Sequence, residues 1–280
     1  MVLAVIDEES IDKEGKWIWP RSKMANLVKK LSEAGARVIS FDIGFLEPDE
    51  KSVVRTIEDI EKNLIFLDVE NRTYLAELKR SSDNDQLLAD AIAESKAKVV
   101  LGYFFQMEKL HSGDFDEALL KIQNKNIQSS RYVQVKFQSE NALEVPLIEA
   151  QVANANITAI SQATPYSGFF NMFPDKDGVV RWIPAVIDYE DEMYAPLSLM
   201  TLSAFKDSQP LVVVAEYGVE KIQFDDITIP TDELGRIMIN YRGDAKSFKH
   251  IPVTDILSGK VPESELKGKA VIVGATAIGI

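Results

Sequence analysis

Hydrophobic residues in the first third of the chain alternate between short continuous runs and helical stripes. The segments 2–6, 37–43 and 98–105 are rich in β-branched and aromatic residues, which is typical of strands buried on both faces. Between the first two segments, apolar residues follow the i, i+3, i+4, i+7 spacing of one helix face: Met24, Leu27, Val28 and Leu31. Strand, helix and strand joined by short connections predict parallel pairing through a right-handed crossover.

The same alternation recurs further along the chain. Residues 83–96, DNDQLLADAIAESK, combine N-capping residue types with a second apolar stripe, and residues 269–276, KAVIVGAT, form another buried run. Alternating elements of this kind favour an α/β fold with a largely parallel central sheet flanked by helices.

The middle of the chain has a different pattern. From about residue 107 to residue 151 it is polar and irregular, and we interpret this part as an insertion whose clearest element is a half-exposed strand, RYVQVKFQ. Apolar runs follow at 178–188, 211–217 and 235–243, with a helix predicted around 195–205. We expect these runs to add antiparallel strands to the one central sheet, which gives a single domain over residues 1–280.

Composition narrows the functional classes. The chain has 31 basic and 44 acidic residues and a formal charge of −13, so it repels phosphate backbones, and nucleic acid is not an expected partner. It has no cysteine, which removes thiolate catalysis and cysteine-based zinc sites. No apolar run reaches the roughly 18 residues of a membrane-spanning helix. Both ends of the sequence lie within apolar runs, which predicts a fragment excised from a longer polypeptide.

Motifs of known catalytic sites are missing from the sequence. His111 and His250 are its two histidines, and each lies in a polar segment typical of a solvated side chain. GATAIG, residues 274–279, has the glycines of a phosphate-binding loop without its Lys-Ser/Thr pair. DKDG, residues 175–178, lacks the later acidic ligands of a calcium loop and is a strong turn signal by itself. We therefore predict no catalytic residue, no cofactor and no metal site.

Polar side chains follow the predicted parallel strands at their carboxyl ends. Asp7 follows the first strand, Asp42 lies near the end of the second, and Tyr103 lies toward the end of the third. Ligands bind to open α/β sheets in the crevice outside these strand ends. The two carboxylates have two interpretations: they hold a metal or act as acid and base, or each caps a helix or pairs with a lysine or arginine.

The stretch WIWPRS, residues 17–22, places two of the three tryptophans just before the first helix. Its Trp-Pro pair fixes the angle at which the chain enters the helix, because a buried aromatic ring covers roughly 150–250 Å². Arg21 in the first helical turn opposes the helix dipole, so we expect a carboxylate partner, with Asp7 or Asp42 as candidates. The pair is either a structural ion pair or part of a recognition site for an anionic or polar ligand, with Trp19 as a wall.

The order of these motifs resembles that of one known family. Residues 5–49 contain a strand ending in I-D-x-x-S, the tryptophan turn, a helix ending in A-G-A and a strand ending in F-D-I-x-F. Residues 168–184 contain G-x-x-N-x-x-P-D-x-D-G-x-x-R, which includes Asn171. Residues 239–280 contain Y-R-G, which includes Arg242, and end with L-x-G-K-x-V-x-V-G-x-T-A-x-G. The chain resembles the CHASE2 domain, the type-two CHASE domain, over almost its whole length; Ile18 stands where that family often has proline.

That resemblance implies an extracytoplasmic (periplasmic or extracellular) sensor domain of a bacterial membrane receptor, anchored by flanking transmembrane helices. It also implies a cytoplasmic output domain outside this chain: an adenylate or other nucleotide cyclase, a histidine kinase, a serine/threonine kinase or a diguanylate cyclase. The expected partner is a small-molecule or peptide ligand of unknown identity, and a homodimer fits such a receptor. The candidate ligand-binding residues are Asp7, Trp19, Arg21, Asp42, Tyr103, Asn171 and Arg242.

Two other functions also fit the sequence. A metal-dependent α/β hydrolase would use Asp7 and Asp42, and a dimerisation scaffold would bind no small molecule. The hydrolase predicts a response to divalent metals together with phosphoesterase turnover, whereas the scaffold predicts a dimer and no stabilisation by metabolites.

Overall fold

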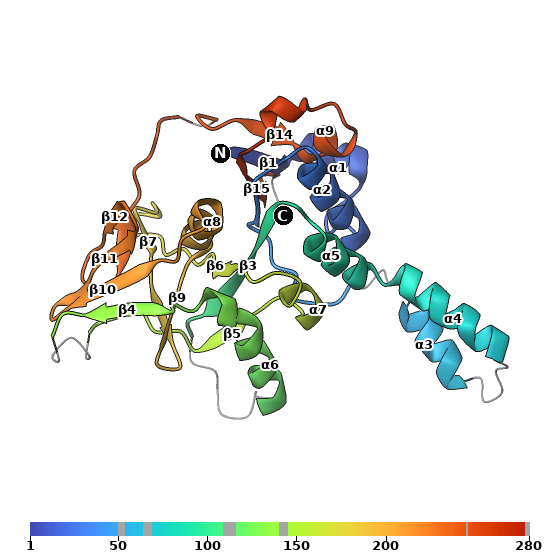
Figure 1. Cartoon of the computed structure of the whole chain (residues 1–280), viewed down its shortest axis with the longest axis horizontal. Coiled ribbons are helices and arrows are strands. Elements are labelled where there is room, and N and C mark those ends of the chain that lie inside the picture. The colour runs from blue at the N-terminus through green and yellow to red at the C-terminus, as the bar shows by residue number, and fades with distance from the viewer. Residues whose placement is uncertain (50–53, 64–68, 109–115, 140–144, 245, 278–280) are drawn as a thin grey trace.

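A seven-stranded sheet lies at the centre of the computed structural model, which describes residues 1–49, 54–63, 69–108, 116–139, 145–244 and 246–277 (Figure 1). The strand order is β14-β1-β15-β2-β3-β5, and β6 also pairs with β3. The strands are β1 (Val2–Ile6), β2 (Val38–Phe41), β3 (Lys98–Gln106), β5 (Val152–Asn154), β6 (Ser167–Phe169), β14 (His250–Pro252) and β15 (Ala270–Ala275). Every described pairing in this sheet is parallel except that of β3 with β5. The prediction of a mixed α/β fold with a largely parallel central sheet is confirmed.

Helices cover one face of the central sheet: α1 (Glu8–Glu14), α2 (Arg21–Glu33), α5 (Asn84–Ala93), α7 (Thr158–Ser161) and α9 (Val253–Leu257). The predicted apolar stripe of α2 is buried against this face, since Leu27, Val28 and Leu31 are all 0% exposed. Side chains alternate along each strand, so Val271 and Val273 of β15 enter this core. Ile272 between them points to the opposite face of the sheet, where the pocket described below is found.

The opposite face of the sheet packs on α8 (Leu197–Lys206), which separates it from a second sheet of four strands (Figure 1). The order of that sheet is β12-β11-β10-β4, with β4 (Gln134–Phe137), β10 (Leu211–Ala215), β11 (Gly218–Phe224) and β12 (Ile227–Pro230). One apolar core joins Val100 of β3, Met200 of α8 and Val212 of β10. The expectation that these strands extend the central sheet is therefore wrong. The reason is α8, which is apolar on most sides and so is buried between two sheets.

Two short antiparallel ribbons complete the strands of the described chain. They pair β7 (Trp182–Pro184) with β13 (Arg236–Met238) and β8 (Ile187–Tyr189) with β9 (Glu192–Tyr194). Single 3₁₀ turns lie at Gln128–Ser130 and Glu263–Glu265. Glycine at position 168 in β6 is needed for packing, because a Cβ there would lie 2.5 Å from the Leu197 nitrogen at the start of α8.

Among the helices that the sequence pattern does not indicate, three are ten residues or longer. The polar insertion of residues 107–151 contains α6 (Glu117–Ile127) besides the expected strand β4, and α6 buries little more than Asn126 and Ile127. The others are α3 (Val54–Asn63) and α4 (Val69–Ser82), which project together from the body of the protein (Figure 1). None of the helices in the described parts of the chain is long and apolar enough to cross a bilayer.

Candidate functional site

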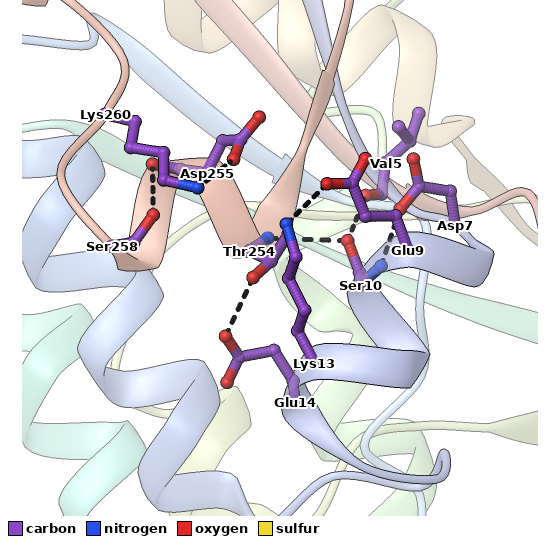
Figure 2. Close-up of polar contacts among 10 residues, drawn as sticks. All are labelled: Val5, Asp7, Glu9, Ser10, Lys13, Glu14, Thr254, Asp255, Ser258 and Lys260. Atoms are coloured by element: carbon purple, nitrogen blue, oxygen red, sulfur yellow. Dashed lines mark hydrogen bonds and ion pairs between the residues drawn. The ribbon is translucent and has the colours of Figure 1, made fainter.

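Asp7 caps a helix at the carboxyl end of β1. Its Oδ1 accepts a hydrogen bond of 2.9 Å from the backbone N–H of Ser10 in the first turn of α1 (Figure 2). Ser10 is 0% exposed, and its hydroxyl lies 3.5 Å from the Val5 carbonyl oxygen and 3.4 Å from the backbone nitrogen of Thr254 in α9. The I-D-x-x-S motif thus holds β1, α1 and α9 together, and the capping interpretation accounts for Asp7.

The charged groups around this corner are paired with one another. Glu14 accepts hydrogen bonds from the Thr254 hydroxyl at 3.0 Å and from Lys23 Nζ at 2.9 Å. The Lys23 hydrogen bond, with a smaller contribution from Thr254, lowers the pKa of Glu14. Across α9, Lys260 lies 3.4 Å from Asp255 (Figure 2). These contacts tie the corner together structurally.

The tryptophan turn fixes the start of α2, as the sequence predicts. Trp19 is 2% exposed, and its indole Nε1 donates a 2.7 Å hydrogen bond to the Gly15 carbonyl oxygen. The Trp17 ring lies edge-on to it at a centroid distance of 5.6 Å. Ile18 between them is 61% exposed, so the turn presents one apolar residue to solvent while both rings pack inward.

Arg21 has acidic partners other than the predicted ones. Its guanidinium donates to the Glu47 carbonyl oxygen at 3.1 Å and lies 3.6 Å from Asp85 Oδ1 at the start of α5. Asp49 accepts the backbone N–H of Arg21 at 2.9 Å. Burial raises the pKa of Asp85 and lowers that of Arg21, which is 8% exposed.

The predicted pairing of Arg21 with Asp7 or Asp42 is therefore wrong. In a sheet of parallel strands, the crossover helices start at the same edge, so α2 and α5 bring their first turns together. The parallel topology could have indicated Asp85 as the partner of Arg21. Asp85 was not considered because it lies 64 residues away along the sequence. A pocket of about 400 Å³ adjoins the turn and is lined by Trp17, Ile18, Trp19, Arg21, Glu47, Pro48 and Asp49. The pocket contains two acidic residues, Glu47 and Asp49, and one basic residue, Arg21. The geometry therefore favours the structural ion pair over recognition of an anion.

A second pocket, of about 330 Å³, lies on the α8 side of the central sheet, and we call it the sheet-face pocket. It contains two of the predicted site residues, Asp42 and Asn171. Asn171 is held by the backbone of Phe105, because its Oδ1 accepts from the Phe105 N–H at 2.8 Å and its Nδ2 donates to the Phe105 carbonyl at 2.7 Å. Asp42 is exposed at the pocket, yet the surrounding protein displaces part of its hydration and raises its pKa.

The two remaining candidates lie elsewhere. Tyr103 is 0% exposed in an aromatic core, where its hydroxyl lies 2.7 Å from that of Ser130 and burial raises its pKa well above the usual value. Arg242 is exposed on the long connection between β13 and β14. The seven residues therefore do not form one site: Trp19 and Arg21 share one pocket, and Asp42 and Asn171 share another.

The geometry does not favour the metal-dependent alternative. Asp7 and Asp42 follow strands that are separated by β15, which places their backbones about 10 Å apart. Asp7 is also engaged as a helix cap. In the described part of the chain, no three histidine, aspartate or glutamate residues are grouped so that they could hold a metal ion.

The fold is a single mixed α/β domain with a pocket on the face of its central sheet. The candidate residues predicted from the sequence are not brought together into one catalytic centre in the part of the chain described. The family model of the CHASE2 domain matches residues 1–280, and the chain belongs to this family. CHASE2 domains are extracytoplasmic sensory domains. A search of curated proteins and a search of solved structures each found no match. The resemblance noted from the sequence motifs is thereby confirmed over the whole chain.

Proposed function

We propose that this chain is the ligand-sensing, non-catalytic part of a bacterial transmembrane receptor and that it lies outside the cytoplasm. The match of the CHASE2 model to all 280 residues carries this proposal. The receptor is anchored by transmembrane helices that flank the chain and regulates a cytoplasmic output domain. That output is a nucleotide cyclase, a histidine kinase, a serine/threonine kinase or a diguanylate cyclase.

The arrangement of the strands supports a signalling role. β1 and β15, the first and last strands of the described chain, pair in parallel in the central sheet. The sheet-face pocket includes Ile272 of β15 and Leu197 of α8, so a ligand there touches both the sheet and the helix that joins it to the second sheet. A ligand shifts a conformational equilibrium only if it binds one state better, and a pocket between two layers changes its shape, and so its affinity for a ligand, when the layers move relative to each other.

Cysteine labelling tests the location of the domain. The chain has no cysteine, so Val133→Cys, at a position 76% exposed, introduces one reporter into the membrane-bound parent protein, with any cysteines outside this chain replaced by serine. We expect a membrane-impermeant maleimide to label this variant in intact spheroplasts. Val28→Cys, at a position 0% exposed, is the control and should react only after denaturation. Labelling of Val133→Cys only after lysis would contradict the proposal.

A further inference from the structure

The sheet-face pocket is walled mainly by apolar side chains. Four parts of the fold contribute to it: Met1 ahead of β1, the face of β2 and β15, the first turn of α8, and the segment that runs from β6 to β7. Its apolar residues include Phe170, Met172, Ile183, Pro184, Leu197 and Ile272. A volume of about 330 Å³ falls in the range of small-molecule sites, which are mostly apolar and carry a few orienting polar groups.

Most polar groups of the pocket are already engaged within the protein. The Ser40 hydroxyl is 2.8 Å from that of Thr201, which also donates to the Leu197 carbonyl at 2.7 Å. Asn171 uses both ends of its amide on Phe105. These groups shape the pocket but have little capacity left to orient a ligand.

Asp42 differs from these groups. It is the one ionisable side chain among the residues that line this pocket, and its carboxylate has no hydrogen-bond or ion-pair partner among the residues described. Asp85, another carboxylate whose pKa is raised by burial, has Arg21 beside it. Partial desolvation without a counter-ion raises the pKa of Asp42, a cost that a bound cation would remove.

We propose that the sheet-face pocket binds a small organic amine with an apolar body, whose ammonium group pairs with Asp42. This inference rests on the proposed sensory function and names the class of ligand that the sensor detects. The apolar body lies against Ile272 and Phe170, and the ammonium donates charge-assisted hydrogen bonds to the Asp42 carboxylate. The acidic charge of the protein, −13 overall, favours the approach of such a cation.

Isothermal titration of the chain with 2-phenylethylamine tests the proposal directly. The controls are 2-phenylethanol, which has the same shape without the charge, and 3-phenylpropanoate, which has the opposite charge. We expect the amine to bind at least about tenfold more tightly than either control, because only the amine can form charge-assisted hydrogen bonds with the Asp42 carboxylate. Asp42→Asn should abolish the preference for the amine. Asp12→Asn removes the same charge from an exposed position of α1 and should leave it intact.

A second variant tests the location independently of charge. Ser198 is exposed and lines the pocket, so Ser198→Trp should fill the pocket, preserve the melting temperature and weaken binding of the amine at least tenfold. Unchanged amine binding by Asp42→Asn or Ser198→Trp, or no amine binding by the folded wild-type chain, would overturn the proposal. None of these three results bears on the maleimide labelling, so failure of this inference is distinguishable from failure of the proposed function.

Discussion

At the residue scale, Arg21 shows how far the sequence predicts a site. The Trp-Pro-Arg order predicts a buried turn and an arginine that needs a carboxylate, and both features are found. The identity of the partner could not be predicted, because Asp85 is far away in sequence and reaches Arg21 only through the side-by-side packing of α2 and α5. The arginine at the start of the helix therefore predicted that an ion pair forms, whereas the tertiary fold determined which carboxylate pairs with Arg21.

The first prediction concerns this ion pair. Arg21→Ala should lower the free energy of unfolding by about 1–3 kcal/mol, because it leaves the partly buried Asp85 carboxylate without its cation. Urea denaturation measures the change. Lys29→Ala, which removes a positive charge from an exposed position of the same helix, should have a much smaller effect. Equal midpoints for Arg21→Ala and wild type would show that the pair contributes nothing to stability.

Replacing Asp42 should stabilise the protein, in contrast to replacing Arg21. Its pKa is raised in the folded protein by desolvation, so the folded state binds the proton more tightly and stability falls as the pH rises through that pKa. Asp42→Asn should therefore raise the melting temperature at pH 7 and lose this advantage at about pH 3, below the ordinary pKa of aspartate. Thermal unfolding at both pH values checks the prediction. A gain that stays constant with pH would mean that ionisation of Asp42 is not its cause.

At the element scale, the spacing of apolar residues correctly predicted the helix and strands that are buried in the core of the central sheet, but it did not predict the helices that lie outside that core. The stripe in α2 and the runs in β1, β2, β3 and β15 are buried as expected, because both layers that contact them are apolar. α6 bears its few buried residues at one end, and α3 and α4 stand away from the body (Figure 1), so none of these three helices buries a long apolar stripe in the core of the protein.

The placement of α8 is the main element-scale difference from the expectation. Its sequence predicts a helix but not that both of its sides are buried between sheets. The close approach at Gly168, where a Cβ would lie 2.6 Å from the Leu197 Cα, holds the start of α8 against β6. Contacts of this kind depend on two backbones meeting, which no local pattern in the sequence specifies. The sheet-face pocket was missed for the same reason, since it forms only where α8, β7 and the central sheet come together.

At the scale of the whole molecule, the proposed signalling requires movement between the layers of the fold. The central sheet contains β1 and β15, the first and last strands of the described chain. α8 packs on the face of this sheet that the other helices leave uncovered, and the second sheet packs on the far side of α8. A ligand between α8 and the sheet would bias their relative position, and the paired strands β1 and β15 would pass that bias to the flanking segments. We propose that the state of this domain sets the activity of a cytoplasmic output domain across the membrane.

A reversible crosslink between α8 and the sheet tests that claim most directly. The hydroxyls of Ser40 and Thr201 are 2.8 Å apart, so Ser40→Cys with Thr201→Cys places two thiols within reach of a disulfide, which forms in an oxidising extracytoplasmic compartment. The measurement is the cyclase or kinase activity of the membrane-bound parent protein before and after reduction, beside the two single-cysteine variants. The account predicts that the crosslinked protein is held at one activity level and that reduction restores the level of the single variants. Identical activity in the crosslinked and reduced states, with the disulfide verified by thiol counting, would contradict it.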